Sequence, residues 1–138
     1  MRLIFLISVI YFFSCAKENT AEEPVDAYRI TQTITYNDID IDVVIDKPAL
    51  NEMDVLLVFH GTVLYDSNLI TAANTTLDKF KGILDSNDMM IVSVAYPQEN
   101  ILFGDNIIEC EAALLWLKNN ASQELGITVN KIFLAGHS

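Results

Sequence analysis

Three residues, Gly136-His137-Ser138, could position a nucleophile because they follow a short apolar run at residues 132–135. Gly-x-Ser is the first half of Gly-x-Ser-x-Gly, the nucleophile elbow, in which a sharp turn after a strand exposes the serine hydroxyl. The turn strains the serine backbone, so the residue two positions earlier must be small, as Gly136 is. The pattern predicts acyl transfer with Ser138 as the nucleophile. The alternative is a serine that caps a following helix.

The elements that would position this serine begin with an antiparallel hairpin. Residues 28–36 and 39–46 each alternate apolar with polar side chains, which predicts two strands with one solvated face. Asn37-Asp38 between them has the composition of a turn. Residues 55–59 are continuously apolar, as expected of a parallel strand covered on both faces. Residues 89–95 and 131–135 are apolar except for Ser93 and Lys131, and they predict two more buried strands.

Two amphipathic helices are predicted between these three runs. In the first, apolar residues recur at steps of three and four from Ile70 to Leu84. The second is expected to end before Gly126 and to bury one face made of Ile107, Cys110, Leu114, Leu117 and Ala121. Because strands and helices alternate after the hairpin, the sequence predicts an α/β fold.

His60-Gly61-Thr62 ends the first of the three apolar runs. At this point the chain resembles the α/β-hydrolase family, in which a His-Gly pair after a strand opens the oxyanion loop. The resemblance covers roughly residues 28–138 and includes the hairpin and the run into Ser138. It implies the N-terminal half of an α/β-hydrolase sheet: an antiparallel hairpin followed by a parallel β-α-β-α-β unit, with strand order 1-2-4-3-5.

The resemblance also implies roles for single residues. Ser138 would be the nucleophile, and the backbone N–H of Thr62 would be one oxyanion donor. His60 is expected to order the oxyanion loop by hydrogen bonding. His137 is adjacent to the serine, so its side chain points away from Oγ, and neither histidine is expected to be the catalytic base. No metal or organic cofactor is implied, and the substrate would be a small-molecule ester or a peptide.

The remaining catalytic groups would follow Ser138 in the chain. In the family the order is Ser, then Asp or Glu, then His, and the second oxyanion donor would be residue 139. We therefore expect the sequence to be a truncated, N-terminal piece of a longer gene product, inactive by itself. The strand at residues 131–135, internal in the complete family sheet, would become an exposed edge and make residues 15–138 poorly soluble.

For the full-length protein, the first hypothesis is a serine hydrolase that cleaves carboxylic esters through an acyl-enzyme. A peptidase or hydrolase of the prolyl-oligopeptidase or dienelactone-hydrolase-like branch is the second, because its elbow and helix pattern look much the same. The third is a non-catalytic binding lipoprotein that keeps the fold. A glycine at position 140 and a later Asp and His would favour an enzyme.

Residues 1–14 predict a signal peptide. Arg2 supplies a positive charge, and residues 3–13 form an apolar run that is too short to cross a bilayer as a helix, which takes about 20 residues. Ser14-Cys15 then resembles the lipobox of bacterial lipoproteins, in which the cysteine carries the lipid. We expect residues 15–27 to be a lipidated tether that anchors residues 28–138, a partial α/β-hydrolase domain, at the membrane of the cell envelope. A cleaved signal peptide and plain secretion is the alternative.

The charge balance argues against one class of partner. Asp and Glu number 19 against 8 Lys and Arg, for a net charge of −11. The phosphates of a nucleic acid would be repelled by such a protein. No disulfide is expected, because Cys15 would carry lipid and Cys110 would pack in the core.

Overall fold

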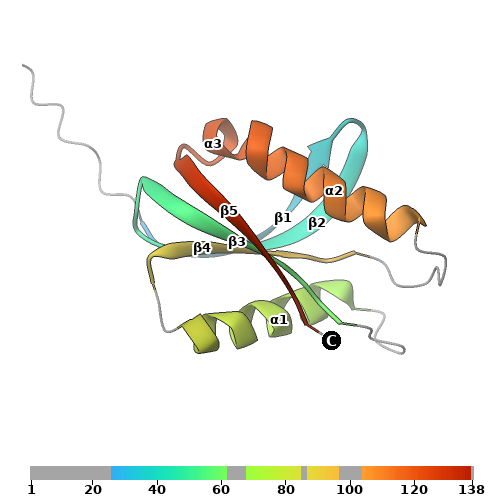
Figure 1. Ribbon diagram of the computed structural model, residues 1–138, viewed down its shortest axis with the longest axis horizontal. Helices are drawn as coiled ribbons and strands as arrows, with labels where there is room; N and C mark the ends of the chain where they lie inside the picture. The colour runs from blue at the N-terminus through green and yellow to red at the C-terminus, as the bar shows by residue number, and fades with distance from the viewer. Residues whose placement is uncertain (1–25, 62–67, 85–86, 97–103, 138) are drawn as a thin grey trace, which may run out of the picture.

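The computed structural model describes residues 26–61, 68–84, 87–96 and 104–137, the last range with side chains from residue 107 onward. The elements in chain order are β1 (Tyr28–Tyr36), β2 (Ile39–Lys47), β3 (Glu52–Phe59), α1 (Leu69–Leu84), β4 (Met89–Val94), α2 (Gly104–Asn119), α3 (Ala121–Glu124) and β5 (Thr128–Gly136). The strands form one sheet, with α1 on one face and α2 and α3 on the other (Figure 1). The predicted α/β class is confirmed.

The hairpin of β1 and β2 closes through a two-residue turn. Asn37 and Asp38 have φ values of 50° and 63°. Positive φ at both central residues is the geometry whose twist matches that of the flanking strands, and Asn and Asp tolerate it better than other residues with side chains. The turn pairs Tyr36 with Ile39 and sets the antiparallel register up to Tyr28 opposite Lys47.

The two faces of the hairpin differ as the alternation predicted. On the face beneath α2, Ile34, Val43 and Ile45 are buried. On the other face, Thr33 donates a hydrogen bond of 2.6 Å to Asp42, and Thr35 donates one of 2.6 Å to Asp40. These cross-strand pairs are exposed, so this part of the sheet is solvated on one side.

The sheet order is β1-β2-β4-β3-β5. β2 runs antiparallel to β4, and β3 lies between β4 and β5 and is parallel to both. The order implied by the sequence resemblance is therefore confirmed. Because β3 is flanked by strands and covered by helices on both faces, residues 55–58 are all buried, which explains their continuous apolar run.

Helix α1 begins at an N-cap and packs on a cluster of apolar residues between the helix and the sheet. The Asn68 side chain accepts a hydrogen bond of 3.0 Å from the Thr71 N–H, which satisfies one of the free donors of the first turn. Ala73 and Leu77 are fully buried against the sheet. The predicted face of this helix is confirmed from Ile70 to Phe80, whereas Leu84 at its end is exposed.

The second predicted helix differs from the structure in its end and in its buried face. It is divided into α2 and α3 at Asn120, so Ala121 belongs to a separate short helix. Ile107 is 59% exposed, and Cys110 and Leu114 are only half-buried. The predicted face was thus wrong for its first half.

The burial of Trp116 explains why α2 buries a different face from the predicted one. Its side chain is fully buried in the cluster beneath α2, and its Nε1–H donates 2.9 Å to a Glu124 carboxylate oxygen in α3. Ala112 and Ala113 are also buried, and their small side chains let the helix lie close to the sheet. Gly126, with φ of 63°, then ends α3 as predicted. None of the helices in the described ranges is long and apolar enough to cross a membrane.

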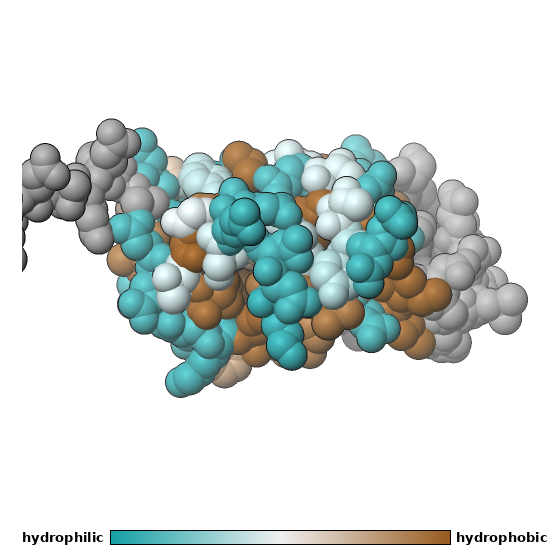
Figure 2. All heavy atoms as spheres, turned by 90° about the horizontal axis from the view of Figure 1, so that it is seen from above, coloured by the Kyte–Doolittle hydropathy of each residue, from teal (hydrophilic) through white to brown (hydrophobic). Residues whose placement is uncertain are grey.

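Strand β5 is an edge of the sheet in the described part of the chain, where it pairs only with β3. Phe133 and Leu134 are 45% and 57% exposed. Consecutive residues of a strand point to opposite faces, so both faces of the sheet are incompletely covered along β5. Figure 2 shows the molecule from the α2 side, where hydrophobic residues reach the surface between hydrophilic ones. The expected exposed edge is confirmed.

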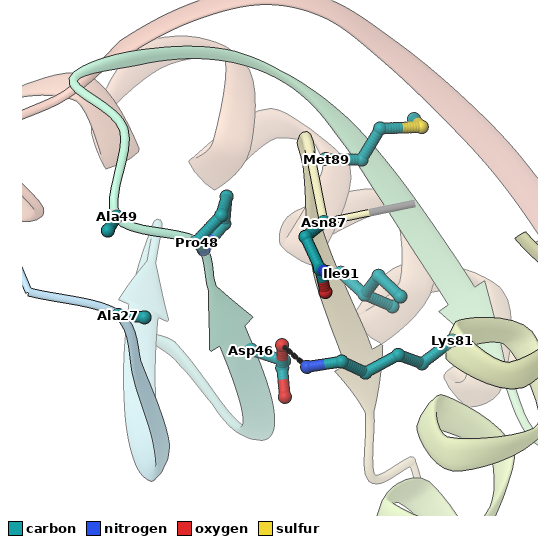
Figure 3. Close-up of a pocket in the computed structure, with 8 residues that line it drawn as sticks. All are labelled: Ala27, Asp46, Pro48, Ala49, Lys81, Asn87, Met89 and Ile91. Atoms are coloured by element: carbon teal, nitrogen blue, oxygen red, sulfur yellow. Dashed lines mark hydrogen bonds and ion pairs between the residues drawn. The ribbon is translucent and has the colours of Figure 1, made fainter. Parts of the chain in front are cut away.

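A cavity of about 250 Å³ lies where β4 begins and β2 ends (Figure 3). Asp46 on its wall is bonded at 2.6 Å to Lys81 of α1 and at 2.7 Å to Arg29 of β1. Arg29 also contacts Asp78 at 2.6 Å. This ion-pair network fastens the C-terminal half of α1 to the hairpin.

The network lowers the pKa of Asp46. Burial of the side chain, which is 13% exposed, raises this pKa, but the hydrogen bonds and charges of Lys81 and Arg29 more than offset that effect. A carboxyl group whose pKa is lower in the folded than in the unfolded state contributes stability above the unfolded pKa, near 4. This contribution is lost as the pH falls through the folded pKa.

The exposed edge generates a prediction about association. We expect residues 15–138 to form oligomers, because the unpaired backbone groups of β5 beside apolar side chains are a template for pairing. Leu134→Lys should make the monomer the major species by size-exclusion chromatography with light scattering. Ile83→Lys, the matched control at a 76% exposed residue of α1, should leave the oligomers unchanged. A monodisperse wild-type monomer with one cooperative urea transition would contradict this prediction.

The ion-pair network generates a second prediction. Asp46→Asn should lower the free energy of unfolding at pH 7 by roughly 1–2 kcal/mol, since it removes a shielded carboxylate with two charged partners. Urea unfolding should show this loss shrinking as the pH is lowered below the unfolded pKa, near 4, because the folded pKa lies lower still. Asp78→Asn removes an exposed partner of Arg29 and should cost less than about 0.5 kcal/mol. Equal losses in both variants, or a loss independent of pH, would show that Asp46 does not act through its charge.

Candidate functional site

The two segments singled out in the sequence meet at one edge of the sheet. β3 and β5 are paired in parallel with Phe59 opposite Gly136, and the N–H of His137 donates 2.9 Å to the carbonyl of Phe59. Parallel strands place their carboxyl ends at the same edge, and the ends of β3 and β5 lie side by side in Figure 1. His60 and Gly61, which follow β3, therefore lie next to His137, which follows β5.

The His60 side chain is enclosed by its own loop and by the end of β4. It is 2% exposed, and its Nδ1 lies 3.0 Å from the Gly61 carbonyl oxygen. A carbonyl can only accept, so Nδ1–H is the donor. The Tyr96 ring is stacked on the imidazole, with centroids 4.2 Å apart and planes 11° apart, and the Tyr96 hydroxyl donates to the His60 carbonyl.

Phe59 completes this aromatic group. Its ring meets Tyr96 edge to face, with centroids 6.3 Å apart and planes 64° apart. Edge-to-face contacts of this kind stabilise beyond the area they bury. Phe59 at the end of β3, His60 at the start of the loop and Tyr96, two residues after β4, are thus packed as one unit.

The His137 side chain points toward α1. Its Nε2 lies 3.0 Å from Nζ of Lys79 in α1, and an ammonium group can only donate, so Nε2 is the acceptor. The side chains of His137 and Lys79 are exposed, and the contact links the end of β5 to the helix covering the sheet. Its hydrogen bond with Lys79 directs the imidazole toward α1.

Gly136 is not crowded by the described residues. A Cβ added at this position would have nothing within 4 Å, and Gly136 is not among the residues with positive φ. The described residues therefore do not explain why the elbow pattern requires a small residue at position 136. Ser138, Thr62 and Cys15 lie outside the described residues, as do the predicted signal peptide and most of the tether.

A free thiol and a cluster of metal-binding side chains would be the other sources of reactivity. Burial, followed by the charge of Glu109, raises the pKa of the Cys110 thiol to about 11, so this half-buried side chain is a thiol at neutral pH. Across the ranges that the structure describes, no three His, Cys, Asp or Glu side chains are grouped so as to hold a metal ion.

Sequence reasoning missed two contacts of the site. No motif or spacing in the sequence points to Tyr96 or Lys79 as a partner of these histidines. Tyr96 packs on His60, and Lys79 on His137. Each pair joins residues far apart in the sequence, so no local pattern announces it.

Comparison with known proteins gives a fold but no family match. No protein-family model matches the sequence, and no curated protein does. Similar solved structures include an arylesterase at 24% identity and TM-score 0.58, a hyperthermophilic esterase from the archaeon Pyrobaculum calidifontis at 20% and 0.63, and a thermostable esterase from Pseudomonas putida ECU1011 at 22% and 0.62.

The likeness extends over most of this chain and a minor part of the others. It covers 80%, 83% and 80% of the chain in these three cases, and the chain spans 35%, 37% and 34% of the respective esterases. At such identities the likeness establishes the fold. The chain has the mixed five-stranded sheet and flanking helices that form part of the α/β-hydrolase fold.

Proposed function

We propose that the full-length protein is a serine hydrolase that cleaves carboxylic esters. The observation that supports this proposal is the hydrogen bond from His137 N–H to the Phe59 carbonyl, which brings His60-Gly61 and Gly136-His137 to one sheet edge. A nucleophile beside a loop of backbone donors is the arrangement that acyl transfer requires.

In this mechanism Ser138 Oγ attacks the ester carbonyl carbon and gives its proton to a histidine base. The tetrahedral intermediate collapses when the C–O bond of the alcohol breaks and the departing oxygen takes that proton. Water then adds to the acyl-enzyme in the same way and releases the acid. The Thr62 N–H, after Gly61, would donate to the negatively charged oxygen in both steps.

Neither described histidine suits the role of base. His60 is buried, and its Nδ1–H is donated to the Gly61 carbonyl. The His137 imidazole is directed toward Lys79 of α1, and its Nε2 accepts the hydrogen bond from that ammonium group. We therefore assign the base to another histidine of the full-length protein.

The choice of esters over peptides is supported by the similar structures. The three proteins named above are an arylesterase and two esterases, and the sheet that they share with this chain is the one that carries the proposed site. A fold alone does not fix a substrate, so esterase chemistry is the part of the proposal that most needs a direct test.

The test uses a fluorophosphonate probe and p-nitrophenyl acetate on the full-length protein. Ser138→Ala should abolish labelling and lower kcat/KM by at least about 10⁴, because it removes the group that forms the acyl bond. Ser122→Ala, an exposed serine of α3, is the matched control and should behave as wild type. Undiminished labelling of Ser138→Ala would place the nucleophile elsewhere, and an unlabelled wild type would favour a binding protein.

We also propose that the protein is exported and anchored in the cell envelope through a lipid on Cys15. The support is the sequence pattern of residues 1–16: a charged start, an apolar run and a small residue before the cysteine. One acyl chain gives only weak membrane binding, so stable anchoring needs more than one.

Metabolic labelling with a clickable fatty acid tests this anchor. The wild-type protein should carry the label and sediment with membranes, whereas Cys15→Ala should lose both properties. Cys110→Ala, which removes the half-buried thiol of α2, is the matched control and should keep the label. A labelled Cys15→Ala protein would disprove the proposed attachment.

A further inference from the structure

The cavity between β2 and β4 lies apart from the candidate functional site. In the parallel pairing of β3 with β4, Met89 on the cavity wall is opposite Asp54 near the start of β3, whereas the candidate site follows Phe59 at the end of that strand. We propose that this cavity is a binding site for a small organic carboxylate, with the anionic head on Lys81 and the hydrocarbon part between β2 and β4. The inference goes beyond ester hydrolysis and does not rest on it.

The polar end of the cavity is built on the ion pair of Asp46 with Lys81. Figure 3 shows the Lys81 side chain reaching from α1 to Asp46 on β2, where Nζ lies 2.6 Å from Oδ1. This contact uses one of the three N–H donors of the ammonium group. The Lys81 side chain is 41% exposed, so the ammonium group can be reached from solvent. Asn87 on the same wall has an amide group that can donate further hydrogen bonds.

The bonds of Asp46 decide which charge the ligand should carry. Both of its carboxylate oxygens are already bonded, Oδ1 to Lys81 at 2.6 Å and Oδ2 to Arg29 at 2.7 Å. A cationic ligand would have to compete with these two partners. An anionic ligand would displace neither, because it would accept hydrogen bonds from Lys81 donors that Asp46 does not use. Hydrogen bonds between an ammonium group and a carboxylate are among the strong ones, so the cavity favours an acid over an amine.

The remaining walls are apolar and select for a hydrocarbon part. Pro48 follows β2, and Met89 and Ile91 belong to β4. Ile91 is 2% exposed and is the cross-strand partner of Asp46, so the apolar wall adjoins the polar end directly. Such walls favour an organic acid over a fully hydrated inorganic anion. The volume of about 250 Å³ is below the roughly 300–1,000 Å³ of sites for drug-sized ligands, so the acid is small.

The test is a titration of the full-length protein with its Ile Cδ1 and Met Cε methyl groups labelled for NMR. The probes are butyrate, butylammonium and butan-1-ol, which share a hydrocarbon chain and differ in charge. At pH 7 and constant ionic strength, butyrate should shift the Met89 and Ile91 methyl signals with a Kd of about 1–10 mM, the weak range expected of so few heavy atoms. The methyl groups of Ile34 and Met53, buried in the cluster beneath α2, should not shift.

The other two probes and a set of variants test the role of charge. Butylammonium and butan-1-ol should bind at least about tenfold more weakly than butyrate, because neither pairs with the Lys81 charge. Lys81→Gln should weaken butyrate binding by a similar factor. Since that change also breaks the pair with Asp46, Asn87→Ala at an exposed residue is the second variant, and it should weaken binding about 3- to 10-fold through the loss of one hydrogen bond. Lys118→Gln, the same charge change on an exposed lysine of α2, is the matched control and should leave the Kd unchanged.

Three results would overturn the inference: no shift of the Met89 and Ile91 signals at about ten times the expected Kd, tighter binding of butylammonium than of butyrate, or an unchanged Kd for butyrate in Lys81→Gln. Shifts confined to these two methyl groups and weakened in both cavity variants would support it. Because the titration does not involve turnover, its result is independent of whether the protein hydrolyses esters.

Discussion

The parallel pairing of β3 with β5 is the constraint on which the candidate site depends. It places Phe59 opposite Gly136 and allows the hydrogen bond between the Phe59 carbonyl and the His137 N–H. The register is fixed by the two cores, since Ile132 packs on the cluster beneath α2 and Ala135 on the cluster beneath α1. A slip by one residue would exchange these faces and separate the His-Gly loop from the elbow.

The strands could be predicted from the sequence because each pattern reflects a single burial environment. Alternation in β1 and β2 follows from one solvated face, and the unbroken apolar run in β3 from two covered faces. The buried face of α2 could not be predicted in the same way. Apolar residues occur on several sides of that helix, and only packing in three dimensions shows that Trp116 is inside and Ile107 outside.

The site was predictable to a similar, partial extent. Its motif residues stand at the ends of apolar runs, so their place at the end of β3 and β5 follows from the strands themselves. The contacts that hold these residues do not follow from the strands alone. Tyr96 meets His60 because β4 lies next to β3, and Lys79 meets His137 because α1 crosses that face of the sheet. These pairs depend on the order of the strands, which no local pattern encodes.

The most direct test of the account is a crystal structure of the full-length protein after reaction with a phosphonate ester. The account predicts a covalent bond from phosphorus to Ser138 Oγ. It also predicts that the phosphonyl oxygen accepts a hydrogen bond from the Thr62 N–H, at the roughly 2.7–3.1 Å typical of an oxyanion donor. Phosphorus bonded to another residue, or a phosphonyl oxygen directed away from the loop after His60-Gly61, would contradict it.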